Sequence, residues 1–87
     1  MKYQVQITDK TLKKLEKLPK RDKERIVEAI DSLVHDSRPD GCKKLKGSLT
    51  PIRYRIRAGN YRIVYSVQDD VLIILVVEVG HRKDVYR

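Results

Sequence analysis

The sequence predicts an α+β fold in which a helical hairpin packs on a small, twisted antiparallel sheet, with the elements in the order β-α-α-β-β-β. A chain of 87 residues has room for a single core, so we expect one domain over residues 1–87. Apolar residues recur at helical spacing in the first half, whereas apolar and cationic residues alternate in the second half. An unbroken apolar run at residues 71–77 is typical of a central strand that is covered on both faces.

The first forty residues predict a short strand and two helices. Residues 3–8 alternate between apolar and polar side chains, which indicates a strand with one buried face. Thr8 or Asp9 can cap the helix that follows, and Pro19 either closes that helix or opens the next one. From about residue 20 to 35, apolar residues recur opposite a face of mixed charge. The apolar stripe of this hairpin needs a sheet to lie on.

Two arginine-bearing strands are predicted after a basic connector. Residues 52–57 alternate strictly, so their apolar and cationic side chains would lie on opposite faces of a strand. The cationic face would carry Arg53, Arg55 and Arg57. Residues 58–60 offer a hairpin turn, and residues 61–67 form the return strand, with Arg62 on the outer face.

Charge is distributed unevenly along the chain. The net charge of +8 favours a polyanionic partner, which could be nucleic acid, an acidic protein or an anionic membrane. Residues 1–40 hold ten Lys/Arg and eight Asp/Glu, whereas residues 41–87 hold ten and four. Between residues 41 and 68 there are seven cations and no carboxylate, which is a composition suited to phosphate groups. The candidate RNA-binding residues are Arg53, Arg55, Arg57, Lys43, Lys44 and Lys46.

The sequence lacks the features of disulfide-dependent, secreted, membrane-spanning and metal-binding proteins. The single cysteine, Cys42, cannot form an internal disulfide, so the fold does not depend on an oxidising compartment. No signal peptide is visible and the longest apolar run is too short to span a bilayer, so we expect a cytoplasmic protein with no membrane partner. The sequence has no Cys/His metal spacing and no glycine-rich phosphate loop. We therefore expect chemistry that needs no metal and no cofactor.

Three segments and the order of elements resemble the RelE branch of the RelE/ParE toxin superfamily over the whole chain. The segments are Lys43-Lys44-Leu45-Lys46-Gly47, Tyr61-Arg62-Ile63-Val64-Tyr65 and Val79-Gly80-His81-Arg82-Lys83-Asp84-Val85-Tyr86. The resemblance implies a RelE-like fold and a toxin that enters the ribosomal A site. There it would cut messenger RNA without a metal, by attack of a ribose 2′-hydroxyl on the neighbouring phosphate. The implied partners are messenger RNA, ribosomal RNA and an acidic antitoxin that forms a hetero-oligomer with the toxin.

The resemblance also implies a role for individual residues. Arg53 and Arg55 would present positive charge to the RNA, and Arg62 would clamp the scissile phosphate. In the tail, Arg82 would assist the departing 5′-oxygen, and Tyr86 would stack on a base or orient it. The candidate catalytic residues are Arg62, Arg82, His81, Tyr86 and Arg55.

Proton transfer is where this chain departs from the family pattern. Well-studied relatives carry lysine where this chain has Arg53 and Arg55, and a guanidinium effectively cannot lose a proton. His81 would then be the base or the acid, because imidazole exchanges protons near neutral pH. Cationic groups held on adjacent strands would stabilise negative charge as it builds on the phosphate. Tyr54 or Tyr61, if exposed, could stack on bases, but Tyr61 and Tyr65 are expected in the core rather than as stacking residues.

Other functions stay open at this point. A ParE-like protein that poisons DNA gyrase would share the fold but is not expected to keep the arginine, histidine and tyrosine set. A basic RNA-binding module without chemistry would bind in a salt-sensitive way and leave no 2′,3′-cyclic phosphate ends. Alternating arginines can also be no more than a solvated outer face.

Overall fold

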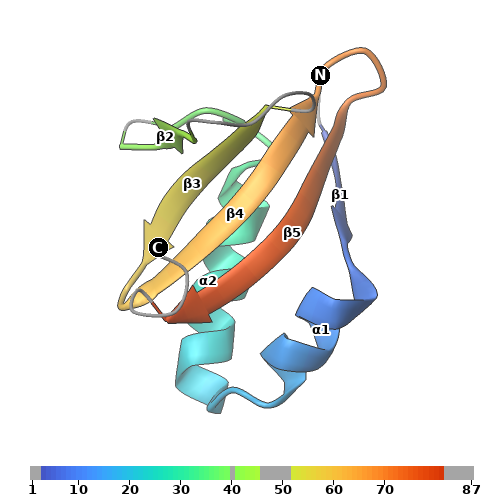
Figure 1. Ribbon diagram of the computed structural model, residues 1–87. Coiled ribbons are helices and arrows are strands. Elements are labelled where there is room, and N and C mark those ends of the chain that lie inside the picture. The colour runs from blue at the N-terminus through green and yellow to red at the C-terminus, as the bar shows by residue number, and fades with distance from the viewer. Residues whose placement is uncertain (1–2, 40, 46–51, 82–87) are drawn as a thin grey trace.

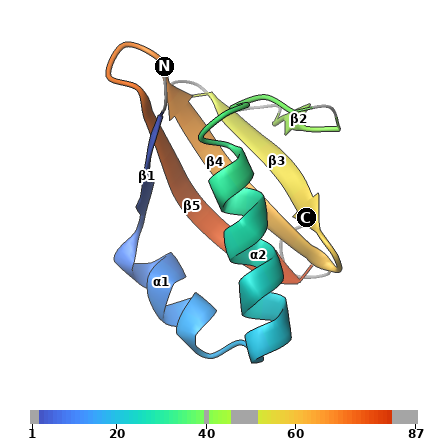
Figure 2. The same cartoon turned by 180° about the vertical axis from the view of Figure 1, so that it is seen from behind.

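Two helices and a five-stranded sheet make up the part of the chain that the computed structural model describes, which is residues 3–39, 41–45 and 52–81. The elements are β1 (Gln4–Ile7), α1 (Asp9–Glu16), α2 (Lys20–Ser32), β2 (Lys43–Lys44), β3 (Arg53–Ala58), β4 (Tyr61–Gln68) and β5 (Ile73–His81). Both helices lie on one face of the sheet (Figure 1), and the reverse view shows α2 running across it (Figure 2). The predicted α+β class with a helical hairpin on a sheet is confirmed.

The strands lie side by side in the order β1-β5-β4-β3-β2. The pairs from β5 to β2 are antiparallel, but β1 runs parallel to β5, with Gln4 opposite Ile73. The prediction of a wholly antiparallel sheet is therefore wrong at this edge. The connection from β1 to β5 is long and contains the helices, as a parallel pair requires, and apolar alternation alone does not set strand direction. The two-residue strand β2, which pairs with Tyr54 and Arg55, was also not predicted.

The core fills the space between the helices and the sheet. The helices contribute Leu15, Ile26, Ile30 and Leu33, and the strands contribute Ile56, Ala58, Ile63, Tyr65, Ile74, Val76 and Val79. Each fully buried aliphatic side chain stabilises the fold by about 1.5–3 kcal/mol relative to exposure. Of the two predicted caps, Thr8 is the one used, because its Oγ1 accepts a hydrogen bond from the Thr11 backbone N–H at 3.3 Å. Neither described helix is long and apolar enough to cross a membrane.

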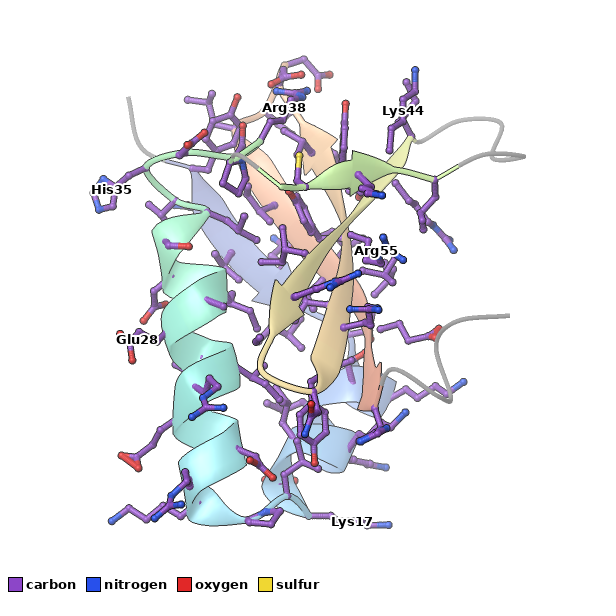
Figure 3. The ribbon with its side chains drawn as sticks, turned by 90° about the vertical axis from the view of Figure 1, so that its left-hand side faces the viewer. Lys17, Glu28, His35, Arg38, Lys44 and Arg55 are labelled. Atoms are coloured by element: carbon purple, nitrogen blue, oxygen red, sulfur yellow. The ribbon has the colours of Figure 1, made fainter. Side chains whose placement is uncertain are left out.

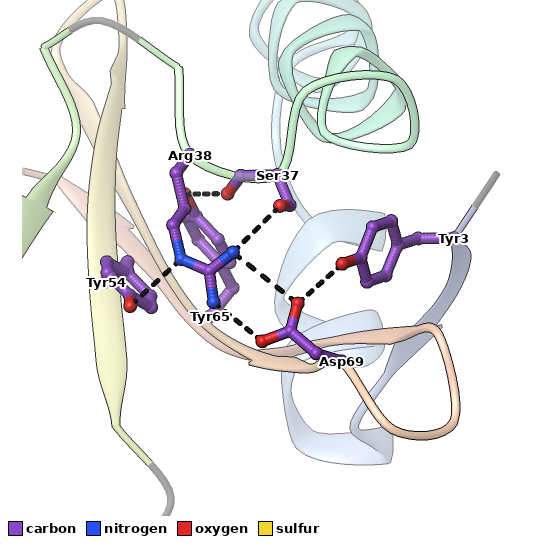
Figure 4. A network of polar contacts seen from close by, with 6 residues as sticks. All are labelled: Tyr3, Ser37, Arg38, Tyr54, Tyr65 and Asp69. Carbon is purple, nitrogen blue, oxygen red and sulfur yellow. Dashed lines mark hydrogen bonds and ion pairs between the residues drawn. The ribbon is translucent and has the colours of Figure 1, made fainter. Parts of the chain in front are cut away.

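A polar clamp centred on Arg38 and Asp69 joins separate elements at one end of the sheet (Figure 4). Arg38 Nη2 donates to Asp69 Oδ2 at 2.9 Å, and its Nε donates to the Tyr54 hydroxyl at 3.1 Å. The Tyr3 hydroxyl donates to Asp69 Oδ1 at 2.5 Å. The hydrogen bonds from Arg38 and Tyr3 hold the pKa of Asp69 below its usual value. The clamp thus connects the residue before β1, strand β3 and the β4–β5 turn to the segment that follows α2.

Candidate nucleic-acid interface

The face of the sheet opposite the helices carries an arginine surface. It is formed by Arg53, Arg55 and Arg57 of β3 and Arg62 of β4. Residues directly opposite each other in an antiparallel pair point to the same face, and Arg57 lies opposite Arg62. Figure 3 shows Arg55 on the side of the sheet away from α2, while Glu28 lies on the helix side. The predicted grouping of arginines from two neighbouring strands on one face is therefore present.

The four arginines differ in how much they are exposed. Arg53 and Arg57 are exposed, whereas Arg55 and Arg62 are only 5 % and 4 % exposed. A guanidinium keeps its charge on burial, and a charge acts more strongly where water is excluded: two unit charges 4 Å apart interact by about 1 kcal/mol in bulk water and about 4 kcal/mol near a protein surface. Both buried arginines also interact with other groups of the chain. Two buried charges flanked by two exposed ones suit a polyanion that lies across both strands.

The predicted RNA-binding lysines do not all share this face. Lys43 lies opposite Arg55 and so extends the arginine surface onto β2, whereas Lys44 lies opposite Tyr54 on the other face. Both lysines are exposed, and Figure 3 shows Lys44 pointing away from Arg55. Lys46 lies outside the described residues.

His81 lies on the opposite face from the arginine surface. It pairs with Tyr61, and the two rings meet edge to face with their centroids 5.8 Å apart. The Tyr61 hydroxyl in turn donates to Asp22 of α2 at 3.2 Å. Because Arg62 follows Tyr61 directly and pairs with Gly80, Arg62 points the other way. His81 and the arginine surface therefore lie on opposite faces of the sheet, and the chemical role of His81 stays a prediction.

The tyrosines of β3 and β4 pack toward the helices. Tyr54 stacks on Tyr65 with ring centroids 5.8 Å apart, and the Arg38 guanidinium lies 5.2 Å from the centroid of the Tyr54 ring. Tyr65 is fully buried, as predicted, and its hydroxyl donates to the Ser37 carbonyl at 2.8 Å. Tyr54 and Tyr61 are each partly buried against the core on the helix face, so the exposure that stacking on bases would require is not met in full, and Tyr61 packs against the core as expected. Arg82 and Tyr86 lie outside the described residues, so their roles stay predictions.

One acidic residue that sequence reasoning passed over lies on the same face as the arginines. Glu78 is exposed and lies opposite Val64, which in turn lies opposite Arg55 on the other side of β4. Glu78 is the only carboxylic residue in the five described strands. No local sequence pattern predicts this placement, because it depends on the register between β4 and β5.

Comparison with known proteins identifies the family. Residues 5–86 match the model of the family described as the ParE toxin of type II toxin-antitoxin system, parDE. The chain belongs to the RelE/ParE toxin superfamily. A RelE-like toxin protein of Escherichia coli is 35 % identical over 99 % of this chain and 92 % of that protein. The mRNA interferase toxin RelE of Escherichia coli strain K12 is 26 % identical over 95 % of this chain and 86 % of its own.

A solved structure extends the likeness from sequence to fold. The archaeal RelE–RelB complex from Pyrococcus horikoshii contains a chain that is 33 % identical, with a TM-score of 0.82 over 94 % of this chain and 97 % of that chain. The named relatives are of the RelE type, so this protein is a RelE-type toxin of a type II toxin–antitoxin system.

The chemical capacity of this RelE-type toxin follows from the groups on its helix-free face. That face supplies guanidinium groups that can each hold two phosphate oxygens through a planar fork, together with one carboxylate. Among residues 3–39, 41–45 and 52–81, no group of three or more His, Cys, Asp and Glu side chains is placed to hold a metal ion.

Proposed function

We propose that this toxin is a ribosome-dependent messenger RNA endoribonuclease that inhibits translation. The observation that carries the proposal is the arginine surface, in which Arg55 and Arg62 are buried on the face that no helix covers. The relative named mRNA interferase toxin RelE supports the same activity. An enzyme that acts on translating ribosomes works in the cytoplasm.

The proposed reaction is an attack by a ribose 2′-hydroxyl on the neighbouring phosphate, without a metal. A bond forms between O2′ and phosphorus, and the bond from phosphorus to O5′ breaks. Negative charge builds on the phosphoryl oxygens, and Arg55 and Arg62 would stabilise it from fixed positions. Removing one such preorganised donor from an enzyme typically costs about 2.7–4 kcal/mol of transition-state stabilisation.

The remaining residues complete the site in this proposal. Arg53, Arg57 and Lys43 would hold the RNA backbone at the exposed rim through its phosphates. Arg82 would assist the departing 5′-oxygen, and Tyr86 would stack on a base or orient it. His81 could take part only if its ring left Tyr61, so the proposal does not depend on it.

The test is to map the ends of messenger RNA cut during cell-free translation. We expect 2′,3′-cyclic phosphate ends with the unaltered toxin and a rate at least about 100-fold lower with Arg62→Ala. Arg62→Lys keeps the charge but loses the fork, and should give an intermediate rate. Arg21→Ala removes an exposed arginine of α2 and should cut like the unaltered toxin. Undiminished cleavage by a folded Arg62→Ala variant would refute the proposal.

A second function is favoured by the family model, which is that of the ParE toxin. A protein of that kind would inhibit DNA gyrase instead of cutting RNA. A supercoiling assay with purified gyrase separates the two functions. Inhibited supercoiling together with intact messenger RNA would support the gyrase function and exclude the nuclease.

We also propose that an acidic antitoxin binds this toxin in a hetero-oligomer. The relative from Pyrococcus horikoshii was solved as a RelE–RelB complex. The net charge of +8 favours an acidic partner, whose helix or strand would cover the arginine surface and so exclude RNA from it.

A further inference from the structure

We propose that Glu78 is the general base that accepts the proton of the 2′-hydroxyl, an inference that rests on the endoribonuclease function proposed above. The reaction needs a group that can take up this proton, and none of the four guanidinium groups can, because each is already fully protonated. His81 faces Tyr61 on the other side of the sheet. Glu78 carries the only carboxylate of the described strands, and it lies on the arginine face.

The strand register puts Glu78 beside the buried arginines. One row across three strands reads Arg55, Val64 and Glu78, and the next row reads Arg57, Arg62 and Gly80. Val64 lies between Arg55 and Glu78, which are therefore two strand spacings apart, roughly 10 Å. Glu78 is the diagonal neighbour of Arg62, at about 7–8 Å between backbones and within reach of long side chains. Gly80, opposite Arg62, places no side chain between them.

A β-bulge gives Glu78 this position. Glu78 lies opposite Val64, but Tyr65, the next residue of β4, lies opposite Val76, so β5 contains one extra residue, Val77. In a bulge the extra residue redirects the side chains next to it, and bulges are common beside active sites. In a regular strand, residues two positions apart lie on the same face. The extra residue therefore allows Val76 to lie in the core while Glu78 lies on the arginine face.

Core packing and a hydrogen bond from α1 both hold the bulge in place. Val76 and Val79 are both in the core, at 0 % and 1 % exposure, although three positions apart on one strand. The Thr11 hydroxyl of α1, itself only 2 % exposed as a residue, donates to the Val77 carbonyl at 3.0 Å. This bond satisfies a carbonyl in the region where β1 has already ended, since Ile7 lies opposite Val76. The position of Glu78 is therefore held by the packing of α1 on the sheet.

The surroundings of Glu78 leave its carboxylate accessible. The side chain is exposed and forms no salt bridge with any other residue that the structure describes. Lys10 and Lys14 of α1 line a cavity of about 130 Å³ together with Thr11, Val77 and Glu78. Among the residues that the structure describes, Lys10 and Lys14 share this cavity with Glu78, and Arg62 and Arg55 are its charged neighbours in the strand register. All are cations, which also attract the RNA that Glu78 would act on.

In the proposed step, Glu78 takes up the proton that the nucleophile loses. The 2′-hydroxyl transfers its proton to the Glu78 carboxylate as its oxygen forms the bond to phosphorus. The bond from phosphorus to O5′ breaks with its electron pair on O5′, which takes a proton from water. The products are a 2′,3′-cyclic phosphate and a free 5′-hydroxyl, and Glu78 returns its proton to solvent.

The experiment measures the single-turnover cleavage rate on programmed ribosomes at saturating toxin, from acidic to alkaline pH. We expect Glu78→Gln to lower the cleavage rate by about 100-fold or more. The fall in cleavage rate that the unaltered toxin shows toward acidic pH should be absent in this variant. Glu78→Asp keeps the carboxylate on a shorter stem and should retain part of the rate. Glu24→Gln removes an exposed carboxylate of α2 and serves as the matched control. Circular dichroism shows whether each variant is folded.

Binding distinguishes a base from a surface charge that merely repels RNA. Both roles predict that Glu78→Gln binds ribosomes as tightly as the unaltered toxin or more tightly. Only the base loses cleavage at the same time, whereas removing a repelling charge leaves the rate unchanged or raises it. A Glu78→Gln rate equal to or above that of the unaltered toxin overturns the inference and leaves the nuclease function intact. Absence of cleavage by the unaltered toxin overturns both.

Discussion

Arg57 and Arg62 place two positive charges directly opposite each other on neighbouring strands. Like charges directly opposite each other destabilise a sheet. This pair therefore lowers the stability of the fold, which suggests that it serves binding. Arg62 is almost fully buried and Arg57 is exposed beside it. This arrangement resembles other binding sites for anions, where repulsion in the free protein is relieved when the ligand arrives.

The first prediction concerns this pair. Arg57→Thr removes the repulsion and puts a β-branched residue on the strand, so the free energy of unfolding should rise by about 0.2–1 kcal/mol. RNA binding should weaken, and the slope of log affinity against log salt should fall by about one. Urea denaturation and RNA titrations at several salt concentrations measure the two effects. A variant that is less stable than the unaltered protein would contradict the repulsion.

A second prediction concerns Asp69, whose pKa is lowered in the folded protein by Arg38 and then by Tyr3. A lowered pKa stabilises the fold above the value of the unfolded chain, about 3.9, and this contribution is lost as the pH falls through the folded pKa. Asp69→Asn should therefore lower the urea midpoint at pH 7 more than at pH 3. A difference that does not shrink on acidification would argue against an ionic clamp. Asp70→Asn, in the same turn, is the control.

At the scale of elements, β5 determines how the site is assembled. Among the described strands it alone pairs in parallel on one side and antiparallel on the other, and it contains the bulge that directs Glu78. Thr11 connects this bulge to α1, so a helix on the far face contributes to the order of the arginine face.

The third prediction tests this connection. Thr11→Val keeps the shape of the side chain but leaves the Val77 carbonyl without its hydroxyl donor, so the free energy of unfolding should fall by about 1–3 kcal/mol. If the bulge positions Glu78, the cleavage rate should fall as well while ribosome binding is unchanged. Ser32→Ala, which removes an exposed hydroxyl of α2, should change neither quantity appreciably. Denaturant titration and single-turnover rates provide both measurements.

The elements themselves could be read from the sequence, because their signals are local. Alternation predicts β3 and β4, and the apolar stripes predict α1 and α2. The direction of β1, the pairing of Lys43 with Arg55 and the extra residue at Val77 depend on contacts between distant segments. Alternation within each strand correctly predicts that the arginines share one face. It does not predict the face on which His81 lies, because a shift of one position in the register moves a side chain to the other face.

For the whole molecule, charge is the dominant property. The net charge of +8 is combined with a helix pair of mixed charge and an arginine surface on the opposite side. Such a distribution steers anionic partners toward one face and speeds their association. RNA and an acidic antitoxin would thus compete for the same region.

The fourth prediction follows from this competition. The association rate of the antitoxin should fall steeply between low and high salt, while the dissociation rate changes little. The double variant Arg53→Gln/Arg57→Gln should reduce this salt dependence, whereas Arg21→Gln on α2 should not. Stopped-flow fluorescence at several ionic strengths measures both rates. Equal salt dependence in the two variants would show that the antitoxin does not dock on the arginine surface.

The last of the described strands to be synthesised, β5, lies inside the sheet and not at its edge. Because β5 lies between β1 and β4, the five-stranded sheet cannot form until β5, the last of the described strands, has been synthesised. Until then β1 has no partner and the Glu78 bulge does not exist. The row of Arg55, Val64 and Glu78 is therefore incomplete on the nascent chain, and the nuclease activity proposed for it would require a finished β5.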